Sequence, residues 1–139
     1  MTLDGVLHPT VLLADDHAAT AEQLRTLLAP HFEVVEIVED GRALVAAEAR
    51  LSPDAIVADI SMPTLDGIEA CALIRRRNPD ARIVLVTVHS EPVLVERALA
   101  VGALGYVLKD AAGDELVAAV QAALGGQRFV SGVLAGRAK

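Results

Sequence analysis

Tryptophan is absent from this chain of 139 residues, and cysteine and tyrosine occur only once each, as Cys71 and Tyr106. A single cysteine excludes an internal disulfide and a cysteine-rich metal site. Cys71 falls among apolar residues of a helical pattern, and we expect it in the core. Lysine is also scarce: against ten arginines there are only Lys109 and Lys139. A lysine at 109, in a chain that otherwise uses arginine, indicates a position that needs a compact point charge.

Long apolar runs and clustered positive charge are missing as well. No apolar run approaches the roughly 20 residues that a membrane-spanning helix needs. The net charge is −7, whereas a nucleic-acid-binding surface normally gathers cations. Residues 1–9 contain Asp4 but no lysine or arginine, which argues against a secretory signal. The composition predicts a soluble, cytoplasmic protein with no membrane contact.

Five short apolar runs alternate with five helical patterns. This alternation predicts an α/β fold, a (βα)₅ doubly wound domain with a five-stranded parallel sheet. The run at 33–38 is interrupted by acids and is predicted at an edge of the sheet. The predicted strands are 10–14, 33–38, 54–58, 82–86 and 104–108, and the predicted helices are 18–29, 41–51, 66–77, 92–101 and 113–124.

The chain divides into three parts on this reading. Residues 1–9 form an N-terminal extension, and residues 10–126 form one folded domain, a length that suits a single core. Periodicity is lost after the Gly125-Gly126 pair, so residues 127–139 are a tail.

Polar residues stand at the carboxyl ends of four predicted strands. Asp15 and Asp16 follow the first strand, Asp59 the third, Thr87 the fourth and Lys109 the fifth. Because the carboxyl ends of parallel strands share one edge, where ligands bind, these groups are predicted to meet. Taken alone, the Asp-Asp pair is better explained as a solvated turn, and it gains weight only from the other groups.

Together these groups suit phosphoryl chemistry. Magnesium binds a few carboxylate oxygens while keeping positions for water and phosphate. A carboxylate such as Asp59 can attack phosphorus and form an acyl phosphate. Lys109 and Thr87 would neutralise charge on the phosphoryl oxygens. Asp66, in contrast, is better explained as a helix cap.

The chain resembles the receiver domain of two-component response regulators, which have a flavodoxin-like fold, from about residue 10 to residue 130. The segments 12–17 (LLADDH), 86–90 (VTVHS) and 105–110 (GYVLKD) are similar to NarL/FixJ-type regulators, which usually carry a C-terminal LuxR-type DNA-binding domain. Residues 127–139 then resemble the start of a linker to an output domain absent from this chain. The residues that carry the resemblance are Asp15-Asp16, Asp59 with Met62-Pro63 and Gly67, Thr87, Gly102-Ala103, Tyr106 and Lys109.

The resemblance implies that Asp59 accepts a phosphoryl group from a phosphohistidine of a sensor histidine kinase. It also implies that Asp16, Asp59 and the backbone carbonyl of Ser61 bind Mg²⁺, with Mn²⁺ as the alternative ion. Asp15 would act through a bound water.

The resemblance further implies a switch and a tuning pair. Lys109 and Thr87 would contact the phosphoryl oxygens. Thr87 and Tyr106 would move together, the hydroxyl turning to the phosphate and the ring turning inward, which would alter the surface of the fourth helix, fifth strand and fifth helix. Ser61 and His89 would flank the path of attacking water and tune the lifetime of the phosphorylated state.

Two features fall outside the resemblance. Asp110 stands where many receivers have a proline that is often cis. A cis bond without proline costs about 2.5–4 kcal/mol, so we expect a trans bond after Lys109. His8, His17 and His31 have no partner at ligand spacing, and we expect them at the surface.

The leading interpretation is a phosphorylation-controlled switch rather than a turnover enzyme, governing a DNA-binding output domain and able to form a homodimer on phosphorylation. The alternatives are a stand-alone receiver acting through protein contacts and a receiver-like module that is never phosphorylated. A magnesium-dependent aspartyl-phosphate phosphatase is disfavoured, because that family needs an aspartate where Ser61 stands and the chain has no room for a substrate cap.

Overall fold

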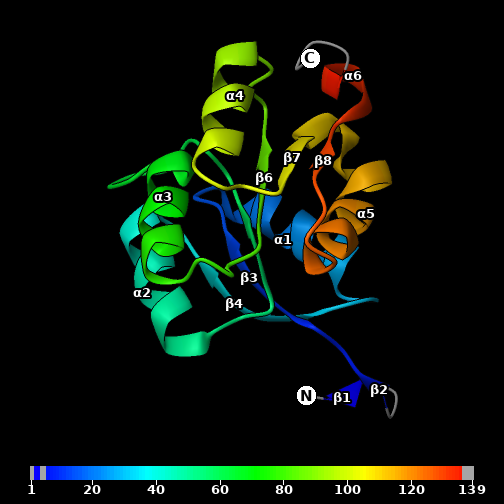
Figure 1. The fold of residues 1–139 in the computed structure, drawn as a ribbon. Coiled ribbons are helices and arrows are strands. Elements are labelled where there is room, and N and C mark those ends of the chain that lie inside the picture. The colour runs from blue at the N-terminus through cyan, green and yellow to red at the C-terminus, as the bar shows by residue number, and fades with distance from the viewer. Residues whose placement is uncertain (1, 4–5, 136–139) are drawn as a thin grey trace.

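A central parallel sheet with helices on both faces forms the body of the computed structural model, which describes residues 2–3 and 6–135 (Figure 1). The predicted strands are β3 (Thr10–Ala14), β4 (Glu33–Val38), β5 (Ala55–Ala58), β6 (Ile83–Thr87) and β7 (Gly105–Leu108). They are parallel in the order β4-β3-β5-β6-β7, so β4 lies at an edge as predicted. The predicted α/β doubly wound fold is confirmed.

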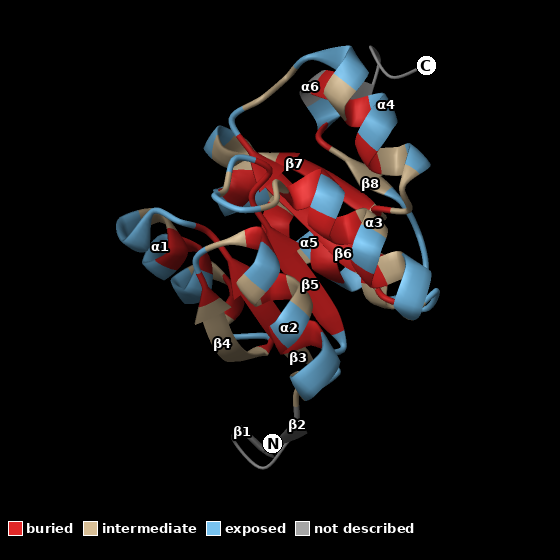
Figure 2. Ribbon diagram, turned by 90° about the vertical axis from the view of Figure 1, so that its left-hand side faces the viewer, coloured by how far each residue is buried: buried red, intermediate tan, exposed pale blue. Residues whose placement is uncertain are grey.

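Five helices make the two outer layers, and each agrees with a predicted helix to within a residue or so. Helices α2, α3 and α4 pack on one face of the sheet, and α1 and α5 pack on the other (Figures 1 and 2). Strands β5 and β6 are buried along their whole length, which explains their unbroken apolar sequence. The bounds are α1 (Ala18–Leu28), α2 (Gly41–Leu51), α3 (Gly67–Arg77), α4 (Pro92–Ala100) and α5 (Ala112–Leu124), with a short 3₁₀ helix at Lys109–Ala111.

A sixth strand, which the sequence pattern does not predict, extends the sheet beyond β7. This strand, β8 (Phe129–Val130), pairs in parallel with β7 and leads into the short helix α6 (Gly132–Ala135). Leu134 of α6 is buried in the core cluster on the face of the sheet that α2, α3 and α4 cover. Two paired residues are too few to show strand alternation, so the sequence carried no signal for β8.

Ser131 fastens this last segment to the domain. Its backbone N–H donates to the Tyr106 carbonyl (2.8 Å), and its hydroxyl accepts from the Leu108 N–H (2.9 Å). The same hydroxyl donates to Glu115 Oε1 of α5 (2.5 Å). Because Ser131 bonds to both β7 and α5, the segment after α5 is held against the strand that leads to Lys109.

At the other end of the chain, β1 (Thr2–Leu3) and β2 (Val6–Leu7) pair antiparallel in a separate two-stranded sheet. Residues 1 and 4–5 of the predicted extension and 136–139 of the predicted tail lie outside the described residues. The division into extension, domain and tail stays a prediction.

The backbone of the described residues contains only trans peptide bonds, including the bond between Lys109 and Asp110 that was predicted to be trans. Within the same residues, no helix is both long and apolar enough to cross a membrane.

Candidate functional site

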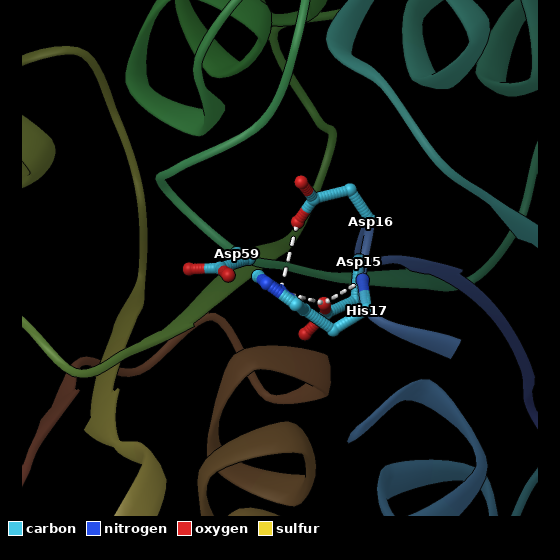
Figure 3. Close-up of side chains that lie close together, drawn as sticks. All are labelled: Asp15, Asp16, His17 and Asp59. Atoms are coloured by element: carbon cyan, nitrogen blue, oxygen red, sulfur yellow. Dashed lines mark hydrogen bonds and ion pairs between the residues drawn. The ribbon is translucent and has the colours of Figure 1, made fainter. Parts of the chain in front are cut away.

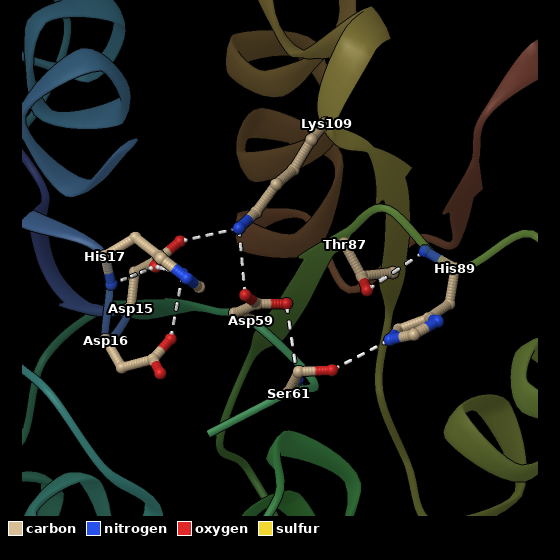
Figure 4. Close-up of polar contacts among 8 residues, drawn as sticks. All are labelled: Asp15, Asp16, His17, Asp59, Ser61, Thr87, His89 and Lys109. Carbon is tan, nitrogen blue, oxygen red and sulfur yellow. Dashed lines mark hydrogen bonds and ion pairs between the residues drawn. The ribbon is translucent and has the colours of Figure 1, made fainter. Parts of the chain in front are cut away.

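The strand ends bring the predicted polar residues together at one edge of the sheet. Asp59, which directly follows β5, lies between the turn at residues 15–17 on one side and Thr87 on the other (Figure 4). Lys109 Nζ lies 2.9 Å from Asp59 Oδ2 and 3.0 Å from Asp15 Oδ2. Residues separated by 50 positions in the sequence are thus in direct contact.

Two of the three carboxylates are buried and depend on Lys109 for charge compensation. Asp15 is 1% exposed and Asp59 is 4% exposed, whereas Asp16 is open to solvent. Buried charges are costly unless they are paired. Burial lowers the pKa of Lys109, but its hydrogen bond to Asp59, its close contact with Asp15 and the charges of both carboxylates outweigh burial and leave the pKa raised. Lys109 is therefore a cation at neutral pH.

The acidic groups have capacity for a metal ion. Asp15 Oδ1 accepts from the His17 backbone N–H (2.8 Å). Asp15 Oδ2 is buried and accepts no hydrogen bond of good geometry, although its ion pair with Lys109 supplies charge compensation. Ligand atoms of Asp15, Asp16, His17 and Asp59 all lie within 4.8 Å of one another (Figure 3). Carboxylate oxygens are the protein ligands that Mg²⁺ prefers, so the residues fit that ion.

His17 departs from the sequence expectation. Its ring is 68% exposed, as expected, but Nδ1 lies 3.1 Å from Asp16 Oδ1 and 3.5 Å from Asp15 Oδ1. The expectation that it has no partner is wrong. The residue is the N-cap of α1 and has an extended backbone, so the chain turns there and the ring lies beside the preceding carboxylates. The sequence expectation considered only partners at metal-ligand spacing and therefore missed Asp16, which directly precedes His17.

Close backbone packing fixes the position of Asp59. A Cβ at Gly67, the first residue of α3, would lie 2.2 Å from the Asp59 carbonyl oxygen, so glycine is required there. The Gly67 N–H donates to the Ile60 carbonyl (2.8 Å). Asp66 and Glu69 form a capping box at the same helix start, which confirms Asp66 as a helix cap.

A hydrogen bond joins the loops that follow β5 and β6. Ser61 Oγ and His89 Nε2 lie 2.8 Å apart, and the Ser61 backbone N–H lies 3.4 Å from Asp59 Oδ1 (Figure 4). Sequence reasoning singled out both residues but did not predict that they bond to each other. Their separation of 28 positions gives no local signal for the contact.

Thr87 and Tyr106 are both buried and both bond to the backbone of His89. Thr87 Oγ1 accepts from the His89 N–H (3.2 Å), and the Tyr106 hydroxyl donates to the His89 carbonyl (2.8 Å). Burial, followed by the charges of Glu91 and Asp59, raises the pKa of Tyr106 to about 12. The tyrosine ring is thus turned inward, and the Thr87 hydroxyl accepts a hydrogen bond from the loop that directly follows β6. That these two residues form a switch stays a prediction.

The sequence matches a known family over most of its length. The family model described as the response regulator receiver domain matches residues 11–121. The transcriptional regulatory protein DegU of Brevibacillus brevis is 34% identical over 122 residues, which cover 86% of this chain and 52% of that protein. The response regulator UvrY of Escherichia coli (strain K12) is 34% identical over 127 residues, covering 90% and 58%. The chain therefore spans about half the length of these curated relatives.

Solved structures give the same result. The two-component response regulator of the LuxR family from Aurantimonas sp. SI85-9A1 superposes with a TM-score of 0.90 at 33% identity, covering 95% of this chain and 96% of that one. The isolated REC domain of RcsB from Salmonella enterica serovar Typhimurium, solved with the phosphomimetic BeF₃⁻, gives a TM-score of 0.87 at 28% identity, covering 96% and 100%.

Proposed function

The chain belongs to the response regulator receiver domain family, and we propose that Asp59 accepts a phosphoryl group from the phosphohistidine of a sensor histidine kinase. The observation that carries this proposal is the contact of Lys109 with Asp59 beside two further carboxylates. An Asp59 oxygen attacks phosphorus, the P–N bond breaks, and the imidazole leaves with the electron pair. A receiver is a signalling module rather than a classical enzyme, and its chemistry is its own phosphorylation and dephosphorylation.

Each polar group has a role in this transfer. Asp16, Asp59 and the backbone carbonyl of Ser61 would hold Mg²⁺ or Mn²⁺, with Asp15 acting through a water. When bound, such an ion would supply positive charge to the phosphoryl oxygens. The spare capacity of the buried Asp15 oxygen supports this assignment. Lys109, already bonded to Asp59, keeps contact with the transferred group, and Thr87 donates its hydroxyl to it.

Phosphorylation then changes the surface formed by α4, β7 and α5. In the arrangement described above, Thr87 accepts from the His89 N–H and Tyr106 donates to the His89 carbonyl. When the Thr87 hydroxyl turns toward a phosphoryl oxygen, the His89 N–H loses its acceptor and the loop before α4 is free to shift. Tyr106 follows that loop, and the two arrangements form a two-state equilibrium that phosphorylation biases.

The kinase and the output are the two partners of this switch. A groove of about 600 Å³ between α1 and α5 borders Lys109, so a helix docked there brings a phosphohistidine near Asp59. The curated relative DegU is named as a transcriptional regulatory protein, and RcsB dimers have been solved bound to DNA. We infer that this receiver works in the cytoplasm, pairs on phosphorylation and controls transcription through a DNA-binding domain outside these residues.

Intact-mass measurement after incubation with acetyl phosphate and Mg²⁺ tests the acceptor. The parent chain should gain the mass of one phosphoryl group, and Asp59→Asn should gain none. Asp114→Asn, an exposed carboxylate on α5, is the matched control and should behave like the parent. Equal uptake by the parent and by Asp59→Asn would contradict the proposal.

We expect the hydrogen bond between Ser61 and His89 to slow dephosphorylation of Asp59. Because Ser61 and His89 bond to each other beside Asp59, replacing either by alanine should open a path for water and speed dephosphorylation by roughly 3–10-fold. Since they bond to each other, the double variant should be no faster than the faster single variant. Following the decay of phosphorylated protein by mass measurement checks this, and unchanged rates or strictly multiplicative effects would count against it.

A further inference from the structure

We propose that His17 is a direct metal ligand, so that the acidic site takes a divalent transition-metal ion, such as Mn²⁺ or Ni²⁺, with an imidazole nitrogen in its coordination shell. The proposal rests on the proposed function in one respect, that the carboxylates at this strand edge hold a divalent cation. It adds a ligand that the receiver resemblance does not assign and a change in metal preference that follows from it.

The distances leave little rearrangement to make. Two ligands on opposite sides of an ion, each bound at about 2.1 Å, stand about 4.2 Å apart. One ligand atom from each of Asp15, Asp16, His17 and Asp59 already lies within 4.8 Å of the others (Figure 3). Small side-chain shifts would therefore let Asp16, His17 and Asp59 converge on one ion, with Asp15 reaching it through a water.

The unequal charge of the cluster points to a cation independently of the imidazole. Three carboxylates face one ammonium, Lys109, and the buried Asp15 Oδ2 accepts no hydrogen bond of good geometry. A divalent ion would balance the remaining charge. His17 contributes a nitrogen lone pair to that ion instead of further negative charge.

A backbone hydrogen bond holds the turn that carries His17 beside the carboxylates. The His17 N–H donates to Asp15 Oδ1 (2.8 Å), which ties the turn together. Nδ1 contacts the two preceding carboxylates, and the ring is 68% exposed, so it can rotate onto an ion without breaking core packing.

The ligand chemistry predicts a change in preference among metals. Mg²⁺ takes oxygen ligands almost exclusively, whereas imidazole suits first-row transition metals. His17 should therefore add affinity for Mn²⁺ and more for Ni²⁺, and should add almost none for Mg²⁺. The ratio of Ni²⁺ affinity to Mg²⁺ affinity, rather than either affinity alone, therefore indicates whether a nitrogen ligand is present.

Calorimetric titration of the full chain with MgCl₂, MnCl₂ and NiCl₂ tests the preference. His17→Ala should weaken Ni²⁺ binding by on the order of tenfold or more, while Mg²⁺ affinity stays within about twofold of the parent. His31→Ala, an exposed histidine next to α1, is the matched control and should change neither. Equal weakening of Mg²⁺ and Ni²⁺ by His17→Ala would overturn the proposal.

Pulsed electron paramagnetic resonance of the Mn²⁺-loaded chain gives a direct reading of the bond. A nitrogen hyperfine coupling should be present in the parent and in His31→Ala and absent in His17→Ala. Absence of that coupling in the parent would overturn the assignment of His17 alone. Mg²⁺ binding that survives both Asp16→Asn and Asp59→Asn would instead overturn the acidic site itself, so the two failures are distinguishable.

Discussion

The single cysteine and the single tyrosine each report on one place in the fold. Cys71 lies in the core on the inner face of α3, where burial raises the pKa of its thiol to about 12 against the opposing charge of Arg75. Tyr106 lies in β7 with its hydroxyl bonded to His89. Because each residue type occurs once, a thiol reaction rate or a tyrosine titration of this chain reports on that one residue.

Cys71 should be nearly inert to thiol reagents in the folded chain. Because the thiolate is the reactive form, a pKa near 12 lowers the reaction rate at pH 8 by at least about a hundredfold relative to an ordinary thiol. The rate of modification by a disulfide reagent, with and without denaturant, checks this. Fast modification of the native chain would show that α3 opens readily.

Tyr106 predicts how stability changes at alkaline pH. Its folded pKa is raised from 10.0 to about 12, so the protonated tyrosine favours the folded state. That contribution is fully present below about pH 10 and is lost as the pH rises toward about 12. Ultraviolet titration of the single tyrosine should show a midpoint above that of the denatured chain. Coincident midpoints would contradict the buried position.

At the scale of elements, α3 fixes the site because its first turn lies against Asp59. The capping box at Asp66 sets where the helix begins, and Gly67 allows the close approach to the Asp59 carbonyl. Loss of the Asp66 cap should therefore affect stability alone. A side chain at position 67 should affect both stability and phosphorylation of Asp59.

Loss of the cap should cost stability. Asp66→Ala removes an acceptor for the Glu69 N–H, and the free energy of unfolding should fall by about 1 kcal/mol. Glu91→Ala, at the N-cap of α4 where no side chain caps the helix, is the control and should have little effect. Urea unfolding followed by circular dichroism measures both, and equal losses would contradict the assignment.

Gly67→Ala should damage both stability and phosphorylation. The added methyl group meets the Asp59 carbonyl, and accommodating it should cost about 1–3 kcal/mol and displace the acceptor carboxylate. Gly113→Ala in α5 meets no atom within 4 Å and should be neutral or stabilising. Urea unfolding and phosphoryl uptake of the two variants check this. A fully active, fully stable Gly67→Ala would show that the close approach is not needed.

At the scale of the whole molecule, the sequence predicted the elements and contacts that follow from the repeating βα pattern, and it missed contacts that depend on loop geometry. Each of the five strands and five helices has a recognisable apolar pattern, and because the carboxyl ends of parallel strands share one edge, Asp59 and Lys109 were expected to meet. In contrast, β8 is too short to show a pattern, and the Ser61–His89 bond joins residues from separate loops. The contact of His17 with Asp16 depends on the turn geometry before α1.

Addition of metal should stabilise the entire fold. An ion that binds only the folded chain adds about 2.7 kcal/mol at a concentration one hundred times its dissociation constant. Mg²⁺ should therefore raise the melting temperature by several degrees, and EDTA should reverse the gain. Sodium chloride of equal ionic strength is the control for screening. A gain that persists in Asp16→Asn would contradict metal binding through the carboxylates.

Strand β8 also bears on the tendency of this sheet to recruit other chains. An exposed edge strand has unpaired backbone N–H and C=O groups that can pair with another molecule, which leads to aggregation. The edge of β7 is paired with β8, and beyond the end of β8 the Ser131 hydroxyl accepts a hydrogen bond from the Leu108 N–H. The opposite border carries the acidic Glu33 and Glu36 of β4. Removing residues 129–135 should leave the edge of β7 exposed and favour the formation of intermolecular sheets.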